Sequence, residues 1–138
     1  MRKLIFLGEG SFGPALLAST VSITGIEPAE DTFALDGSNP QQVRQAVDSI
    51  CNAVHRKDSL VILCDFSMSK AMEEAWLVLE KRSMIHRMIL ISGANVPCAA
   101  AAMTFKEEIA DDAQYARSIL SEGKSGISVL GTAVHATN

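Results

Sequence analysis

The chain has 138 residues, of which 48% are hydrophobic, 20% charged and 5% aromatic, and its formal net charge at pH 7 is −4. This length and apolar content indicate one domain over residues 1–138, with an aliphatic core and an ordered part over about 3–130, and they exclude a largely disordered chain. The acidic balance argues against a nucleic-acid partner, and no apolar run reaches the roughly 20 residues of a spanning helix, so we expect no direct membrane insertion.

Apolar runs of strand length alternate with helical patterns in the first half of the chain. A continuous apolar stretch predicts a strand over 4–7, and Ser11 is placed to cap the helix that follows. A second short strand is predicted over 32–35. Pro40 then stands at the first position of a helix with a clear apolar stripe.

The second half continues the same alternation. The predicted elements are a strand over 59–64, a helix over 69–81, a strand over 88–91, a helix over 97–110, a helix from 111 or 112 to 123, and a short strand over 127–130. This order predicts a three-layer α/β/α open sheet of about four parallel strands. The last strand is either an ordinary edge strand of the same sheet or is exchanged in a homodimer, and we expect a frayed tail after it.

Ligands of open parallel sheets bind beyond the carboxyl ends of the strands, so the loop after the first strand is a candidate ligand site. Gly8–Gly13 spells G-x-G-x-x-G there, and Asp36 closes the second predicted strand. This pattern is typical of a Rossmann-like nucleotide site, although the carboxylate of Glu9 would repel a pyrophosphate. The alternative is a tight strand-to-helix turn with no ligand.

The histidines and cysteines suggest no further site. His55 and His86 precede the third and fourth strands and should lie at the opposite edge of the sheet, while His135 is in the tail. The three cysteines, at 51, 64 and 98, fit neither a disulfide framework nor a zinc signature, so we expect no metal and a reducing cytoplasmic location.

Four segments of the sequence are similar, in the same order, to motifs of a known family. They are Gly8–Leu17, Val61–Asp65, Gly93–Cys98 and Glu122–Ile127. Their order and spacing resemble the mannose-type enzyme IIA domain of the bacterial sugar phosphotransferase system. In that family the first and third segments read small-His-Gly-x-Phe-Ala-x-Gly-Leu-Leu and Gly-Val-Asn-x-Pro-Met. The resemblance covers the chain from residue 4 to residue 130.

The resemblance implies a phosphoryl relay in sugar uptake. In the family, a histidine of the first loop accepts a phosphoryl group from the phosphocarrier HPr and passes it to a IIB component, without a cofactor. It also implies a cytoplasmic homodimer that exchanges its last strand. Here the histidine position is Glu9, and the loop that reads Asp-x-x-Gly-Gly-Ser-Pro-x-Asn in the family keeps only Asp65.

The candidate site follows from this alignment. Glu9 and Asp65 stand at the phosphotransfer position, and the surrounding crevice is formed by Gly8, Gly10, Ser67, Ser69, Lys70 and Asn95. We hypothesise that a Glu9–Lys70 ion pair fills the space of the family's phosphohistidine–serine contact. Two functions stay open beside the nucleotide site: a phosphotransferase-type relay that uses Glu9, and a non-catalytic regulatory or binding module on the same fold.

Overall fold

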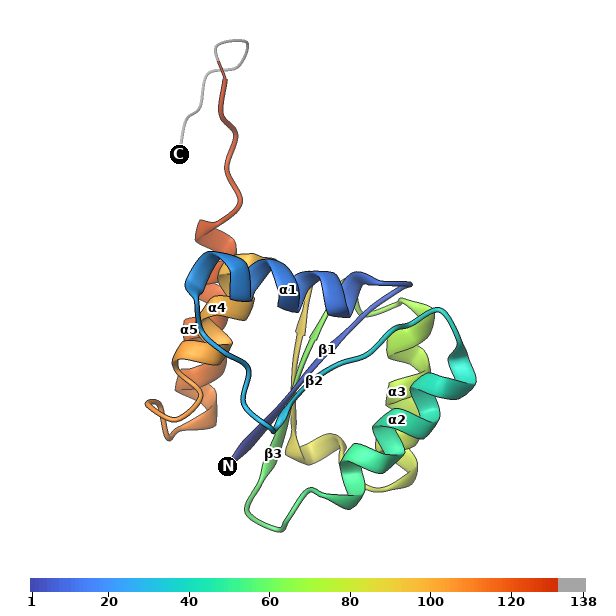
Figure 1. Ribbon diagram of the computed structural model, residues 1–138. Coiled ribbons are helices and arrows are strands. Elements are labelled where there is room, and N and C mark those ends of the chain that lie inside the picture. Colours follow the sequence, from blue (N-terminus) through green and yellow to red (C-terminus); the bar gives the residue numbers. More distant parts are fainter. Residues whose placement is uncertain (132–138) are drawn as a thin grey trace.

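The computed structural model describes residues 1–131, which form a parallel sheet with helices on both faces (Figure 1). The elements in chain order are β1 (Arg2–Leu7), α1 (Phe12–Thr24), β2 (Thr32–Ala34), α2 (Pro40–Asn52), β3 (Ser59–Cys64), α3 (Lys70–Lys81), the 3-10 turn η1 (Ile85–Arg87), β4 (Met88–Ser92), α4 (Val96–Thr104) and α5 (Asp112–Ser125). The predicted α/β fold with four parallel strands is confirmed.

The strand order is β2-β1-β3-β4, so β1 and β3 are the central pair. Their continuous apolar runs suit strands that are covered on both faces, and every residue from Leu4 to Leu7 and from Leu60 to Cys64 is fully buried. Leu7 of β1 pairs with Cys64 of β3 at the carboxyl end of the sheet. The loops after these two strands therefore emerge side by side.

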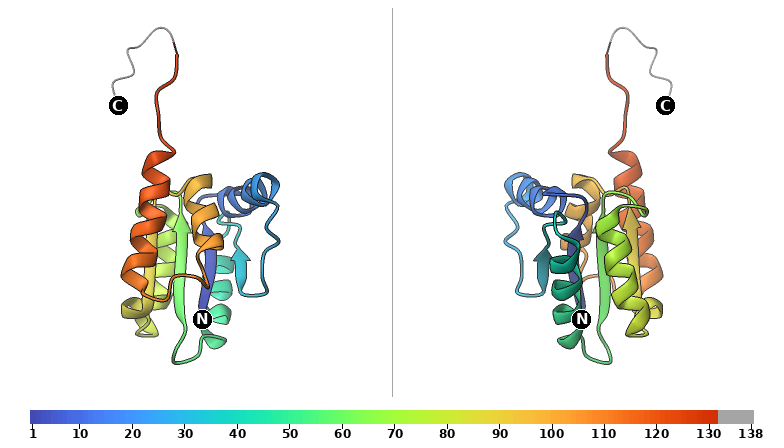
Figure 2. Two further views of the ribbon diagram at one scale, coloured as in Figure 1. Left: turned by 90° about the vertical axis from the view of Figure 1, so that its left-hand side faces the viewer. Right: turned by 90° about the vertical axis from the view of Figure 1, so that its right-hand side faces the viewer.

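Each face of the sheet has its own core. Ile5 and Leu7 point to the face covered by α2 and α3, whereas Leu4 and Phe6 point to the face covered by α1, α4 and α5. The views in Figures 1 and 2 show these two helical layers on either side of the strands. On the α4–α5 side the largest fully buried side chain is Tyr115, whose hydroxyl donates to the carbonyl of Ala102 at 2.6 Å.

One predicted helix is shorter than expected. The alanine-rich pattern predicts a helix to residue 110, but α4 ends at Thr104. The connection that follows is held by the guanidinium of Arg2, which donates to the carbonyls of Lys106, Ile109 and Ala110 and so stabilises a non-helical path to α5. Arg2 itself is only 7% exposed.

The end of the chain also departs from expectation. Helix α5 continues past Gly123 to Ser125, and residues 127–130 belong to no strand of the described chain. This segment leaves the domain at the end of α5 (Figure 1), and Ile127, Val129 and Leu130 are exposed. The prediction of an ordinary edge strand within the chain was therefore wrong. The expected frayed tail and His135 lie outside the described residues.

None of the helices in the described part of the chain combines the length and the apolar character that crossing a membrane requires.

Candidate functional site

The structure brings Glu9 and Asp65 together at the carboxyl ends of β1 and β3. The backbone N–H of Glu9 donates to Oδ2 of Asp65 at 2.8 Å. The other oxygen of Asp65 accepts from the N–H of Phe66 at 2.9 Å. Both carboxylate oxygens of Asp65 are thus used to hold the two loops in place, and the side chain of Glu9 is left free to point elsewhere.

The carboxylate of Glu9 lies at the N-terminus of α3. Its Oε1 accepts a hydrogen bond of 2.5 Å from the backbone N–H of Lys70, the first residue of that helix. The first N–H groups of a helix have no partner within the helix, and the helix dipole favours a negative charge at that end. An N-terminal helix amide of the kind that binds phosphate groups is therefore engaged by a side chain of the protein itself.

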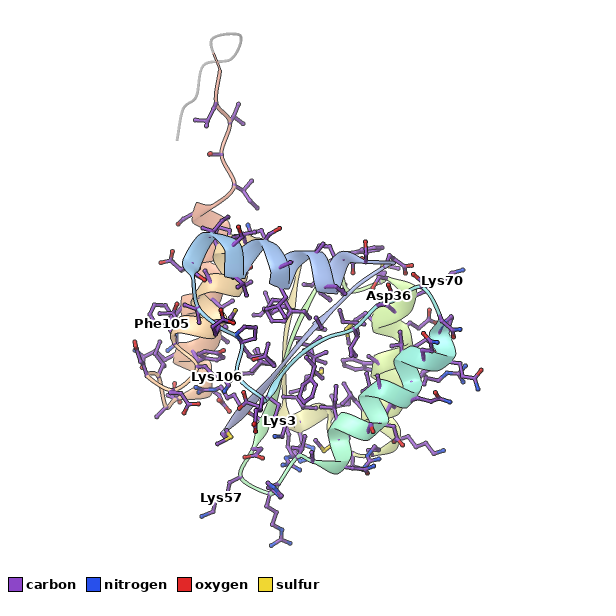
Figure 3. The ribbon with its side chains drawn as sticks, in the orientation of Figure 1. Lys3, Asp36, Lys57, Lys70, Phe105 and Lys106 are labelled. Atoms are coloured by element: carbon purple, nitrogen blue, oxygen red, sulfur yellow. The ribbon has the colours of Figure 1, made fainter. Side chains whose placement is uncertain are left out.

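This contact corrects the hypothesis of a Glu9–Lys70 ion pair. Among residues 1–131 no ion pair joins the Lys70 ammonium to Glu9. The two residues do meet, but through the backbone amide of Lys70, because the start of α3 is aimed at the first loop. Lys70 and Asp36 lie at the same end of the domain in Figure 3, and the side chain of Lys70 is exposed.

Two glycines make the close approach of the loops possible. A Cβ atom at Gly8 would lie 2.7 Å from Cγ of Asp65, so a side chain there would displace the carboxylate that holds Glu9. A Cβ atom at Gly37 would lie 1.8 Å from the carbonyl oxygen of Gly8. Sequence reasoning missed Gly37 as a site residue, although the Asp36-Gly37 pair that closes the second strand was a visible signal.

The other crevice residues have different roles. Gly10 has a φ of +54°, and its carbonyl accepts from the N–H of Gly37 at 2.7 Å, so it shapes the first loop. Ser69 is buried, and its hydroxyl accepts from the N–H of Met72 as the cap of α3. Its hydroxyl oxygen is thus engaged within the protein. Ser67 lies exposed in the same loop.

Asn95 acts on the helices and not on the crevice. Its Oδ1 accepts from the N–H of Cys98 as the cap of α4, and its Nδ2 donates to the carbonyl of Gly123 in α5 at 2.9 Å. Both polar groups of the side chain are committed to joining these two helices. Among the described residues, the side chain of Asn95 makes no hydrogen bond to the crevice around Glu9, so its predicted supporting role there has no contact behind it.

The mouth around Glu9 is open and has apolar side chains on its rim. Phe66 is 51% exposed and Met68 is 82% exposed, both in the loop between β3 and α3. Cavities of about 610, 510 and 410 Å³ lie elsewhere in the domain and are not lined by Glu9 or Asp65. An open surface with exposed apolar side chains suits contact with another protein better than enclosure of a small molecule.

The glycines of the G-x-G-x-x-G pattern have structural reasons to be glycine. A Cβ atom at Gly13 would lie 2.3 Å from the carbonyl oxygen of Phe6, so this residue lets α1 approach the end of β1. Asp36, the acid of that pattern, accepts from the N–H of Ser38 at 2.8 Å, and hydrogen bonds from Ser38 lower its pKa. Packing therefore accounts for the spacing without a nucleotide.

The remaining titratable candidates lie outside the crevice. His55 precedes β3 and His86 lies in η1 before β4, so both are at the amino ends of the strands as predicted. Cys64 ends β3, and burial raises the pKa of its thiol to about 11, which keeps it protonated at neutral pH. Within residues 1–131 no group of three or more His, Cys, Asp or Glu side chains is placed to hold a metal ion.

Solved structures of the same fold come from the sugar phosphotransferase system. The phosphotransferase system component EIIA from Streptococcus agalactiae matches with a TM-score of 0.76 and 17% identity, covering 92% of this chain and 95% of that chain. The mannose/sorbose specific IIA subunit from Enterococcus faecalis matches with a TM-score of 0.73 and 17% identity, covering 94% and 95%. The PTS IIA protein associated with the fucose utilization operon from Streptococcus pneumoniae matches with a TM-score of 0.69 and 14% identity, covering 91% and 90%.

No model of a protein family matches the sequence, and no curated protein matches it. These three structures share 14–17% of their residues with this chain, and at that level of identity the comparison shows the fold alone. The resemblance drawn from the sequence is confirmed at that level: the chain has the fold of the IIA components of the bacterial sugar phosphotransferase system.

Proposed function

We propose that the chain is a IIA-like component of a mannose-family sugar phosphotransferase system that keeps the docking surface of a IIA domain and has lost the phosphoryl relay. Glu9 takes the position where the resembling family has its acceptor histidine. The fold likeness supports the IIA-like role. The partners are then HPr and a IIB component, and the site of action is the cytoplasm.

The observation that carries this proposal is the hydrogen bond from the Lys70 N–H to the Glu9 carboxylate at 2.5 Å. A carboxylate at a helix N-terminus supplies a fixed negative charge where a phosphorylated residue would supply a transient one. It cannot form the phosphoimidazole on which the family's relay depends. The domain would therefore present one permanent charged state to its partners.

Exposed apolar side chains support docking at this end. Phe66 and Met68 stand on the loop that begins directly after Asp65, which in turn holds the backbone of Glu9. Aromatic residues and methionine are enriched in protein–protein interfaces relative to the rest of the surface. We place the contact with HPr and the IIB component on this loop.

A retained relay is the second candidate, because Glu9 is exposed. In that case the P–N bond of phosphorylated HPr would break, a P–O bond to a Glu9 oxygen would form, and the neutral imidazole of HPr would leave. The product, an acyl phosphate, is cleaved by hydroxylamine and survives acid better than a phosphohistidine does. This chemistry distinguishes the two candidates.

Incubation with phosphoenolpyruvate, enzyme I and HPr is expected to leave the mass of the wild-type protein unchanged, because the first loop has Glu9 in place of an acceptor imidazole. The Glu9→His variant is expected to gain one acid-labile phosphate, since the fold and Asp65 are retained. Intact-mass spectrometry measures both results. Glu9→Gln serves as the control that removes the charge without adding an acceptor.

A hydroxylamine-labile phosphate on the wild-type protein would contradict the lost relay. Docking is tested separately by titrating the ¹⁵N-labelled protein with HPr and recording amide chemical shifts. Shift changes are expected in the loop that holds Phe66 and Met68. Changes confined to another face would contradict the proposed docking surface.

We also propose the homodimer in which residues 127–130 are exchanged between two copies. Ile127, Val129 and Leu130 are 75%, 56% and 89% exposed, and β4 has no neighbour on its outer edge within the described chain. An unpaired edge strand and an exposed apolar segment are each a liability that mutual pairing removes.

Truncation after Gly126 is expected to convert a dimer into a monomer, because the exchanged segment is removed while the helix before it stays complete. Size-exclusion chromatography with light scattering measures the mass of the two chains. A matched variant with Val129→Asp, which keeps the full length, should weaken the dimer as well. The same oligomeric state for the full-length and truncated chains would contradict the exchange.

A further inference from the structure

A cavity of about 610 Å³ lies at the end of the sheet opposite to Glu9. Its walls come from the start of β1, the loop between α2 and β3, the turn η1, and the connection between α4 and α5. Figure 3 shows Lys57 and Lys106 at this end, away from Lys70 and Asp36 at the other. Its volume lies within the range of small-molecule sites.

Most charges in the floor of this cavity are already paired. Arg2 donates to Asp112 at 2.8 and 3.1 Å, and Lys106 bonds both carboxylate oxygens of Asp31 at 2.6 Å. Asp58 accepts from the N–H of His55 at 3.0 Å and lies 3.4 Å from the α-amino group. These groups hold the cavity in shape and have little charge left for a ligand.

The side chains that remain without a partner are cations and one imidazole. Among residues 1–131 the side chains of Arg56, Lys57 and His86 make no hydrogen bond or ion pair with another residue. Arg87 donates to the backbone carbonyls of His55 and Asp58, so it has no carboxylate partner there. The acid nearest to them, Glu107, is 72% exposed and is itself paired with Lys106 at 3.3 Å.

This positive wall stands out in a chain whose net charge is −4. A group of cations that the protein does not neutralise is favourable where an anion is to be bound. Guanidinium groups match the oxygen geometry of phosphate, and a lysine adds a point charge. No Phe, Tyr or Trp side chain lines the cavity to stack a base, and the cations are confined to one hollow, which disfavours a nucleic-acid strand.

We propose that this cavity binds a small phosphate monoester, with Arg56, Lys57, His86 and Arg87 as the phosphate-binding wall. The buried pairs of Arg2 and Lys106 form its rigid floor. The site is independent of the proposed IIA-like role, because it lies at the amino ends of the strands and shares no residue with the crevice around Glu9.

Isothermal titration of the full chain with glucose 6-phosphate tests the site, with glucose as the uncharged comparison. We expect heat of binding with the phosphate ester and none with glucose. The double variant Arg56→Ala/Lys57→Ala should weaken the affinity about tenfold or more, because two charged hydrogen-bond donors are lost. The matched control Arg117→Ala/Lys124→Ala removes the same charges from the exposed face of α5 and should change the affinity less than about twofold.

Absence of binding to the wild-type protein would overturn the proposal, and so would equal weakening by the two double variants. Inorganic phosphate, titrated in the same way, shows whether the phosphoryl group alone is sufficient. The Glu9→Gln variant should bind like the wild type. If Glu9→Gln abolished binding, the anion would belong to the other end of the sheet and this site would be wrong, whatever the outcome of the phosphorylation assay.

Discussion

Alanine in place of Gly13 is expected to lower the free energy of unfolding by about 3 kcal/mol or more, the upper range of overpacking in a rigid site. Its Cβ would lie 2.3 Å from the carbonyl oxygen of Phe6 and 2.8 Å from that of Leu35. Both neighbours are backbone atoms, so no flexible side chain can move aside. The carbonyl of Phe6 also accepts from the N–H of Leu35 at 2.9 Å, and displacing it would weaken the link between β1 and β2.

Urea denaturation followed by circular dichroism measures this loss. The control is Gly25→Asn, at the C-terminal cap of α1, where φ is +71° and a Cβ would meet nothing within 4 Å. Asparagine tolerates this left-handed conformation, so its cost should stay below about 1 kcal/mol. If both variants lowered the free energy of unfolding by the same small amount, then glycine would not be required at position 13 by the close approach of α1 to β1.

The Gly13 result also separates two explanations of one sequence pattern. A G-x-G-x-x-G motif between a strand and a helix predicts a nucleotide site, and the same spacing results when a helix starts close against two strand ends. The first interpretation ties the glycine to a ligand, whereas the second ties it to the stability of the unliganded chain. The sequence contains the spacing but not the neighbouring carbonyls, so it could not decide between them.

Those parts of the fold that depend on neighbouring residues could be predicted. The buried runs of β1 and β3 are continuous in sequence, and the caps of α2, α3 and α5 are formed by Asn39, Ser69 and Asp111, each directly before its helix. Caps and apolar runs act over a few residues, so their pattern is visible in the sequence.

The differences arise from contacts between distant residues. Arg2 holds the connection after α4 through carbonyls more than 100 positions away in the chain, and no residue near Thr104 indicates this contact. The bond from Lys70 to Glu9 spans 61 positions. Sequence reasoning placed these two residues together, but it assigned the contact to the ammonium group because the direction of the first turn of α3 depends on tertiary packing.

The two ends of the sheet differ in how their charges are held. At the carboxyl end, Glu9 is exposed and meets a backbone amide. At the amino end, Lys106 and Asp31 are 8% and 11% exposed and bond each other directly. A buried charge depends on its partner far more than an exposed one does, because water cannot replace the partner. The largest electrostatic effect on stability is therefore expected at the amino end.

Replacement of Lys106 by methionine is expected to cost about 3–5 kcal/mol of stability, because it leaves the carboxylate of Asp31 buried without a partner. The carbonyl of Asp31 also accepts from the N–H of Leu4 at 2.9 Å, so movement of this residue would disturb the start of β1. The double variant Lys106→Met/Asp31→Leu should regain most of the loss, since an apolar pair of similar volume needs no counter-charge. Glu107→Gln, at a residue that is 72% exposed, should change stability by less than about 0.5 kcal/mol. Urea denaturation of the wild type, Lys106→Met, Asp31→Leu and the double variant gives the coupling energy, and a double variant no more stable than Lys106→Met alone would mean that the two charges do not depend on each other.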